Sequence, residues 1–219
     1  MVDKHHARRA FLSHLGTGAT AAGLTVLSGR PAAAQSAERS EWHPKRHQAD
    51  DWLDRIPGVH RLLFDTTHPE GFGEALTFAN NYYAANQSGY GLNDADLAVV
   101  IVARHDSAPF AYTEAMWVKY GPSFVERSGF VDPSTKQPPA VNVYRARMEG
   151  LIKRGSHFAV CQLSTRRLAG GIAGASRTDA DSVYNELAAN LVANAHMVPA
   201  GIIAVNRAQE RGYSFTHAG

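Results

Sequence analysis

The stretch that most limits how this chain can fold is DLAVVIVARH, residues Asp96–His105, because it is almost continuously apolar and rich in β-branched side chains. An apolar run this short favours a strand over a helix. A strand with no polar alternation is typical of one covered on both faces, as in parallel sheets. The sequence must therefore supply helices for both sides of a sheet.

Four further strand-like segments alternate with segments that have helical spacing, and a short helix is predicted around Trp52, ended by Pro57-Gly58. The predicted strands are His60–Thr67, Asp96–His105, His157–Gln162, Ala195–Gly201 and Tyr213–His217. The predicted helices are Gly71–Gln87, Pro109–Tyr120, Val141–Arg154, Thr165–Ala173, Asp181–Val192 and Ile202–Arg211. This pattern predicts an α/β, flavodoxin-like three-layer fold of about five mostly parallel strands flanked by helices. We assume the strand order 2-1-3-4-5, which places ligands beyond the carboxyl ends of strands 1 and 3.

The N-terminus has the pattern of an export signal. Arg8 and Arg9 precede a weakly apolar run, LGTGATAAGLTVLSG, and Ala32-Ala33-Ala34 ends in an A-x-A cleavage pattern. The paired arginines and the diluted apolar run indicate a twin-arginine (Tat) type of signal over residues 1–34, cleaved near Ala34. We expect a periplasmic protein with an arm at 35–57 and one α/β domain at 58–219.

Removing the signal changes the charge and narrows the class of partner. The whole chain has 22 basic and 20 acidic residues, and residues 1–34 contain four of the basic residues and one of the acidic residues. The mature chain then has a net charge of about −1, which gives no reason to expect a nucleic-acid partner. The run in the signal is too short to span a bilayer, and no later segment could, so no membrane association is expected after cleavage.

Six side chains are expected near the carboxyl ends of the first three predicted strands. Because these ends meet at one edge of a parallel sheet, they are the candidate site residues. Cys161, the single cysteine of the chain, is the candidate catalytic residue. The candidate binding residues are Thr66, His68, Arg104, His105 and Gln162.

Cys161 has two interpretations. It directly precedes a predicted helix that Ser164 or Thr165 could cap, and Arg104, Arg166 and Arg167 are candidate positive neighbours. A helix N-terminus and positive charge would stabilise the thiolate, which can accept a sulfane sulfur as a persulfide. The alternative is a packed core residue, since cysteine is among the most buried residue types, with Arg166 and Arg167 as solvated helix residues.

Sequence motifs for other chemistry are missing. The chain has no G-x-G-x-x-G, Walker, G-x-S-x-G or C-x-x-C pattern, and DTTHPEGFG lacks a glycine-rich cradle. We therefore predict no nucleotide or flavin cofactor. His68 and His105 could join Cys161 as zinc or copper ligands, but their separation carries no ligand-spacing signal, and no metal is assigned.

Four stretches together resemble exported members of the DsrE/DsrF-like family, close to YchN-like proteins: WLDRIPGVHRLLFD, AVVIVARHDSAPFAYTEAMWVKYG, GSHFAVCQLSTRRLAG and MVPAGIIAVNRAQERGYSF. The resemblance covers most of residues 50–216. It implies the same α/β fold, assembly into homo-oligomers, and membership of sulfur relays in which a cysteine just after a central strand holds a persulfide. Cys161 matches that position by its local context.

Three functions are left open. The first is a periplasmic sulfur-handling protein that exchanges sulfur with a donor or acceptor protein through Cys161. The second is a non-catalytic oligomeric ligand-binding or assembly protein, and the third is a metal- or haem-binding module. For the homo-oligomer, we expect a contact surface built from the Pro-rich stretch GPSFVERSGFVDPSTKQPPA with Phe124, Phe130 and Tyr144.

Overall fold

The computed structural model describes residues 43–219. The predicted signal peptide, its paired arginines, its cleavage site and the first part of the arm lie outside the described residues. None of the helices within residues 43–219 combines the length and apolar character needed to cross a bilayer.

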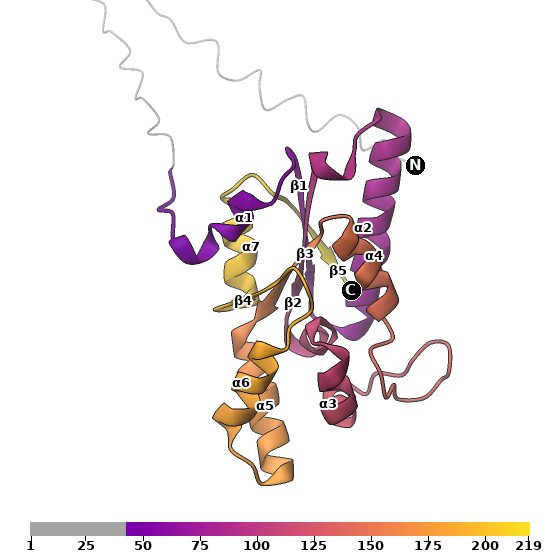
Figure 1. Ribbon diagram of the computed structural model, residues 1–219, viewed down its shortest axis with the longest axis vertical. Helices are drawn as coiled ribbons and strands as arrows, with labels where there is room; N and C mark the ends of the chain where they lie inside the picture. Colours follow the sequence, from indigo (N-terminus) through magenta and orange to yellow (C-terminus); the bar gives the residue numbers. More distant parts are fainter. Residues whose placement is uncertain (1–42) are drawn as a thin grey trace, which may run out of the picture. The chain divides into compact units, whose positions relative to one another are not determined.

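A five-stranded, wholly parallel sheet forms the centre of the domain, with helices on both faces (Figure 1). This confirms the predicted α/β three-layer class. The strands are β1 (His60–Thr66), β2 (Leu97–Ala103), β3 (His157–Cys161), β4 (Ala195–Val198) and β5 (Ser214–Ala218).

The assumed strand order is wrong. The sheet runs β4-β3-β2-β1-β5, so β2 lies between β1 and β3 instead of at an edge. The chain steps in one direction from β1 to β4 and then returns past β1 to add β5. Right-handed crossovers permit either order, and what differs is only the step at which the chain reverses direction. The carboxyl ends of β2 and β3 are therefore direct neighbours.

Strand β2 shows why the apolar run has no alternation. Its side chains point in turn to the two faces of the sheet, and all seven residues are buried. Leu97, Val99, Ile101 and Ala103 belong to one core. Ala98, Val100 and Val102 belong to the other. Burial on both faces is what the uninterrupted run predicted.

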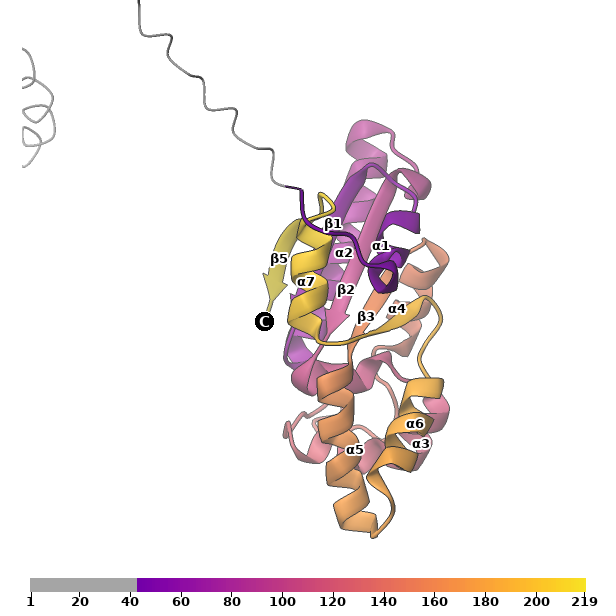
Figure 2. The same cartoon turned by 90° about the vertical axis from the view of Figure 1, so that its left-hand side faces the viewer.

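The helices divide between these two cores according to the direction of each crossover. The crossovers that step from β1 to β4 supply one core, and the final crossover supplies the other through α7, next to α1 (Figure 2). The helices are α1 (Trp52–Arg55), α2 (Pro69–Tyr90), α3 (Glu114–Glu126), α4 (Arg145–Lys153), α5 (Gln162–Ser176), α6 (Ala180–Ala189) and α7 (Gly201–Gln209).

The helix expected over Pro109–Tyr120 starts later and ends later. Pro109 lies in a 3₁₀ segment, η3 (His105–Ala111), and α3 continues through Pro122 instead of stopping there. Pro122 cannot donate to the carbonyl of Val118, but Val118 is 74% exposed, so water can satisfy that carbonyl. Phe124 and Val125 are buried beyond the proline, and their packing stabilises the last turn.

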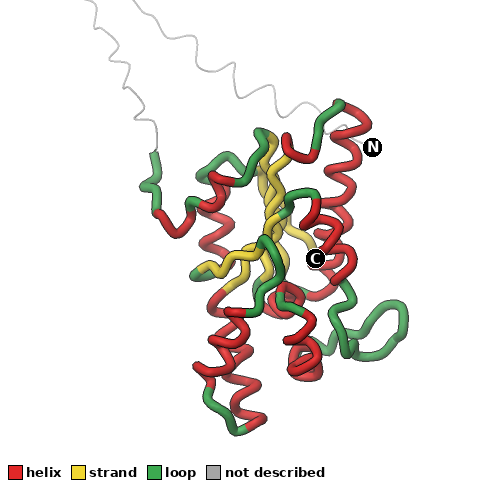
Figure 3. The backbone as a smooth tube through the Cα atoms, viewed as in Figure 1, coloured by secondary structure: helices red, strands yellow, loops and turns green. Residues whose placement is uncertain are grey.

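The prediction that three aromatic residues contribute to an exposed contact surface is also wrong. Phe124, Phe130 and Tyr144 are all buried in the core that also contains Ile101 of β2. There, Phe130 and Tyr144 pack against Phe110. The chain between α3 and α4 leaves the domain as a long loop, drawn in green in Figure 3. The aromatic residues near its two ends anchor that loop and do not form a contact surface.

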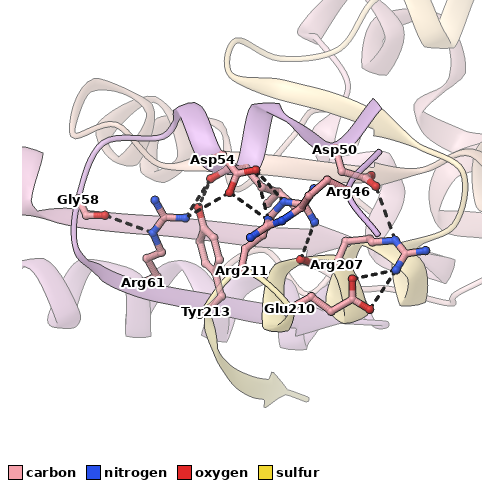
Figure 4. A network of polar contacts seen from close by, with 10 residues as sticks. Arg46, Asp50, Asp54, Gly58, Arg61, Arg207, Glu210, Arg211 and Tyr213 are labelled. Carbon is pink, nitrogen blue, oxygen red and sulfur yellow. Dashed lines mark hydrogen bonds and ion pairs between the residues drawn. The ribbon is translucent and has the colours of Figure 1, made fainter. Parts of the chain in front are cut away.

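A network of charged side chains attaches the segment before β1 to α7 (Figure 4). Asp54 of α1 accepts a hydrogen bond from Arg211 Nε at 3.0 Å and pairs with Arg46 at 3.3 Å. Arg207 of α7 pairs with Glu210 at 2.8 Å and with Asp50 at 3.6 Å. These contacts, together with the buried Trp52, Leu53 and Ile56, fix α1 against one face of the sheet.

Trp52 also packs over a pair of histidines that lie on the neighbouring strands β3 and β4. Its ring stacks on His196 of β4 with the centroids 4.1 Å apart, and His157 Nδ1 of β3 lies 2.9 Å from His196 Nε2. Burial, the neighbouring His157 and Arg55 lower the pKa of His196 to about 4, and burial lowers the pKa of His157. The pair is therefore neutral in the folded protein at neutral pH.

We expect acid to destabilise the domain through this pair. The unfolded chain binds a proton at His196 near pH 6.5, whereas the folded chain does so only near pH 4, so stability is fully present above pH 6.5 and falls as the pH drops toward 4. The expected loss is about 1–2 kcal/mol, reduced from the full linkage value because the group is only half-buried. Urea unfolding of the wild type and His196→Gln across pH 4–8 measures it.

The exposed His60 of β1 provides the matched control for this measurement. His60→Gln should keep the wild-type slope between pH 6.5 and 4, and His196→Gln should flatten it. Equal slopes in all three proteins would contradict the assignment.

Candidate functional site

Cys161 ends β3 and is also the N-cap residue of α5. Its Sγ accepts a hydrogen bond from the backbone N–H of Ser164 at 3.4 Å. The expectation that Ser164 or Thr165 caps this helix is wrong, because Ser164 Oγ accepts from His105 N and Thr165 Oγ1 donates to the carbonyl of Cys161. The sulfur itself therefore occupies the capping position, where an N–H donor stabilises negative charge.

Cys161 is only 4% exposed, yet it lines a cavity of about 110 Å³ at the carboxyl edge of the sheet. The cavity lies between the starts of α5 and α7, with the chain after β2 as its third wall. Its lining residues are Arg104, His105, Cys161, Leu163, Ser164, Arg167, Ala200, Gly201 and Ile202. The thiol thus borders on polar and cationic groups as well as apolar ones.

Arg104 is held by a buried carboxylate. Its Nε and Nη2 donate to the two carboxylate oxygens of Asp65, each at 2.7 Å. The Asp65 side chain is 4% exposed and the Arg104 side chain 18%. The hydrogen bonds to Asp65 raise the pKa of Arg104 further, while burial opposes them and the nearby Cys161 adds to the rise. Arg104 is therefore a fixed cation in the cavity wall.

His105 has an unusual backbone conformation. Its φ is +52°, in the left-handed region that few residues other than glycine adopt, and its N–H donates to Ser164 Oγ at 2.7 Å. Burial is the main cause that lowers its pKa, and the charges of Arg104 and Arg167 lower it further. At neutral pH its imidazole is neutral and can accept a proton.

A second cavity, of about 420 Å³, lies between α3 and α5 and includes η3 in its wall. It shares three lining residues with the smaller cavity: His105, Ser164 and Arg167. The larger cavity is within the size range of small-molecule sites. The two cavities therefore meet at a common wall that carries an imidazole, a hydroxyl and a guanidinium.

The other candidate residues lie elsewhere. Thr66 is fully buried at the end of β1 and donates to the carbonyl of Val102, which is a structural role. His68 is the exposed N-cap of α2, and the Gln162 amide donates to Tyr184 Oη of α6 at 2.7 Å. None of these three lines either cavity. The structure thus gathers Cys161, Arg104 and His105 out of the six residues named from the sequence.

A metal set built from His68, His105 and Cys161 is not formed. Among residues 43–219, no three histidine, cysteine or acidic side chains are positioned to share an ion. The described part of the chain therefore offers no constellation on which to build the metal-binding alternative.

Two contributors to the site were missed in the sequence. Asp65 lies near the end of β1 and forms an ion pair with Arg104, which follows the neighbouring strand β2. Gly201 begins α7, and a Cβ there would lie 2.7 Å from Arg104 Cδ, so only glycine leaves room for the arginine stem. Extending the rule on carboxyl ends from three strands to all five would have pointed to Gly201. Strands 1 and 2 are neighbours in the assumed order as well as in the true one, so the same rule would also have pointed to Asp65 as a partner of Arg104.

Comparisons with known proteins add no function. No protein-family model matches the chain, and no curated protein matches it. Among solved structures, it is similar to the protein of unknown function MTH1491 from Methanobacterium thermoautotrophicum, with 14% sequence identity and a TM-score of 0.41. That match covers 72% of this chain and 98% of the other.

Proposed function

We propose that this protein is an exported, periplasmic sulfur-handling protein of the DsrE/DsrF-like kind, in which Cys161 carries a sulfane sulfur as a persulfide. One observation carries the proposal. The sulfur of Cys161 accepts an N–H at the start of α5 and lines a cavity that also contains Arg104, His105 and Arg167. A cysteine kept only for packing would need none of these polar neighbours.

The cavity has room for a second sulfur. A water molecule takes up about 30 Å³ of liquid volume, and a sulfur atom is of similar size, whereas the cavity is about 110 Å³. A persulfide on Cys161 can therefore form inside it without displacing the wall. The cationic Arg104 and Arg167 stabilise the negative charge that a persulfide carries on its outer sulfur.

The transfer balances without an added oxidant or reductant. A persulfide donor, RSSH, reacts with the thiol of Cys161 to give RSH and a persulfide on Cys161. Neutral His105 takes the thiol proton, Sγ attacks the outer sulfur of the donor, and the bond between the two donor sulfurs breaks. The proton then passes from His105 to the leaving thiolate. Delivery to an acceptor thiol is the same exchange in reverse.

Incubation of the purified mature protein with a persulfide donor tests the proposal. Intact-mass spectrometry should show the gain of one sulfur atom, which a reductant removes. Cys161→Ser should gain none, because it lacks the only thiol of the chain. Absence of a gain with both low-molecular-weight and protein-bound donors would exclude the sulfur-carrying role.

A second candidate function is ligand binding without sulfur chemistry. It is favoured by the 4% exposure of Cys161 and by the neighbouring cavity of about 420 Å³. In this case Cys161 would react with a thiol reagent only after denaturation, and Cys161→Ala would bind the same ligand as the wild type. Labelling of the folded protein with iodoacetamide separates the two functions.

A further inference from the structure

The common wall of the two cavities is electrically unbalanced. Arg104, Arg127 and Arg167 all lower the pKa of His105 through their charge, and only Asp106 opposes them. Asp106 and Glu126 also line the larger cavity, but Asp106 is engaged by Arg127 at 3.1 Å. Arg104 and Arg127 are each paired with a carboxylate, and Glu126 lines the larger cavity alone, so Arg167 is the charged residue in the wall that the two cavities share.

Arg167 is the cation in this wall that is free to bind a ligand. It is exposed, and no acidic side chain within residues 43–219 pairs with it. It lines both cavities, so an anionic group bound to it in the larger cavity would lie next to the cavity that contains the thiol. Arg104, by contrast, is already committed to Asp65.

The two cavities differ in the size of the molecule that each can hold. The smaller, at about 110 Å³, takes only a few atoms, and the larger, at about 420 Å³, takes an organic molecule. A single ligand that fills both would have its body between α3 and α5 and its reactive end at Cys161. The anionic part of that body would lie at Arg167.

From this arrangement we infer that the sulfur donor or acceptor is a low-molecular-weight organic persulfide or thiol that carries a carboxylate, bound with its body in the larger cavity and its carboxylate on Arg167. The inference rests on the proposed function. The partner is then a small molecule whose charge and size match the two cavities. Arg167 is a specificity-determining residue in this scheme, and Cys161 remains the residue that reacts.

Arg166 provides a matched control. It is the neighbouring arginine on α5, but it lines neither cavity. Its guanidinium lies 4.0 Å from the centre of the Tyr184 ring and pairs with Asp181 at 3.3 Å. Arg166→Gln and Arg167→Gln therefore remove the same charge from the same helix, and only the second removes it from the wall of the site.

The test compares the rates at which Cys161 gains sulfur from three donors: glutathione persulfide, the persulfide of 2-mercaptoethanol, which has no carboxylate, and inorganic thiosulfate. Arg167→Gln should slow loading from glutathione persulfide by about tenfold, the effect of losing one charge-assisted contact. Loading from the persulfide without a carboxylate should change less than about twofold, and Arg166→Gln should match the wild type with both. Equal effects of the two variants, or equal slowing with the persulfides that have and lack a carboxylate, would overturn the inference. So would loading from thiosulfate alone.

A binding measurement keeps the inference separate from the proposed function. S-methylglutathione has the same carboxylates but cannot transfer sulfur, so calorimetry reports its affinity for the wild type and both variants. If Cys161 gains no sulfur from any donor but S-methylglutathione binds about tenfold more weakly to Arg167→Gln alone, the sulfur-carrying role fails and the anionic small-molecule site stands. If S-methylglutathione does not bind the wild type, or binds all three proteins alike, the site is rejected.

Discussion

Replacing Phe110 with alanine should lower the free energy of unfolding by about 4 kcal/mol, the loss typical of a large aromatic removed from a packed core. Phe110 is 1% exposed. Its ring lies 4.8 Å from the ring centre of Tyr144 and 5.2 Å from that of Trp117, with Phe72 and Phe130 also in contact. Alanine would leave a cavity that this tightly connected cluster cannot close. Urea unfolding followed by circular dichroism measures the change.

Phe78 of α2 is the matched control for that experiment. It is 44% exposed, so Phe78→Ala should cost less than about 1 kcal/mol. Phe110→Leu, which refills most of the volume, should recover more than half of the loss. A similar cost for Phe110→Ala and Phe78→Ala would show that η3 does not pack into the core as described.

Replacing Arg104 with methionine should cost about 3 kcal/mol of stability, because it leaves the carboxylate of Asp65 buried without its cation. Asp65 is 4% exposed, and His217 Nδ1, 3.5 Å away, is the only other cationic candidate near it within the described residues. Methionine keeps the stem that packs beside Gly201, so the loss reports the charge and not the volume. Removing both charges in Arg104→Met/Asp65→Asn should restore more than half of the stability.

The pair Arg154–Asp94 tests whether burial is the cause. Its arginine also donates to both carboxylate oxygens, in a bidentate pair with distances of 3.0 and 2.8 Å, but its carboxylate is 42% exposed. Arg154→Met should therefore cost less than about 1 kcal/mol. If the Arg104 and Arg154 variants lose equal stability, or the double variant is no better than Arg104→Met, the buried pair does not stabilise the fold.

Only some of the residues that form the site could be predicted from the sequence. Arg104, His105 and Cys161 were expected near one another because the carboxyl ends of parallel strands share an edge, and that argument survives the wrong strand order. The true order brings β2 and β3 together directly, which moves these residues closer than assumed. It leaves Thr66 and His68 at the end of a strand that is not next to β3. Gln162 turns to α6 because Tyr184 offers it a hydrogen bond, which no local pattern indicates.

The sequence by itself determined the layers of this protein, because an unbroken apolar strand can only be buried on both faces, and the period of each segment separates strands from helices. It also determined that a lone thiol comes directly before a helix. Only the tertiary structure decided the strand order and the two cavities that meet at His105 and Arg167. The reason is that these features join residues far apart in the chain. Local propensities and right-handed crossovers are satisfied equally by either strand order, so packing between distant segments makes the choice.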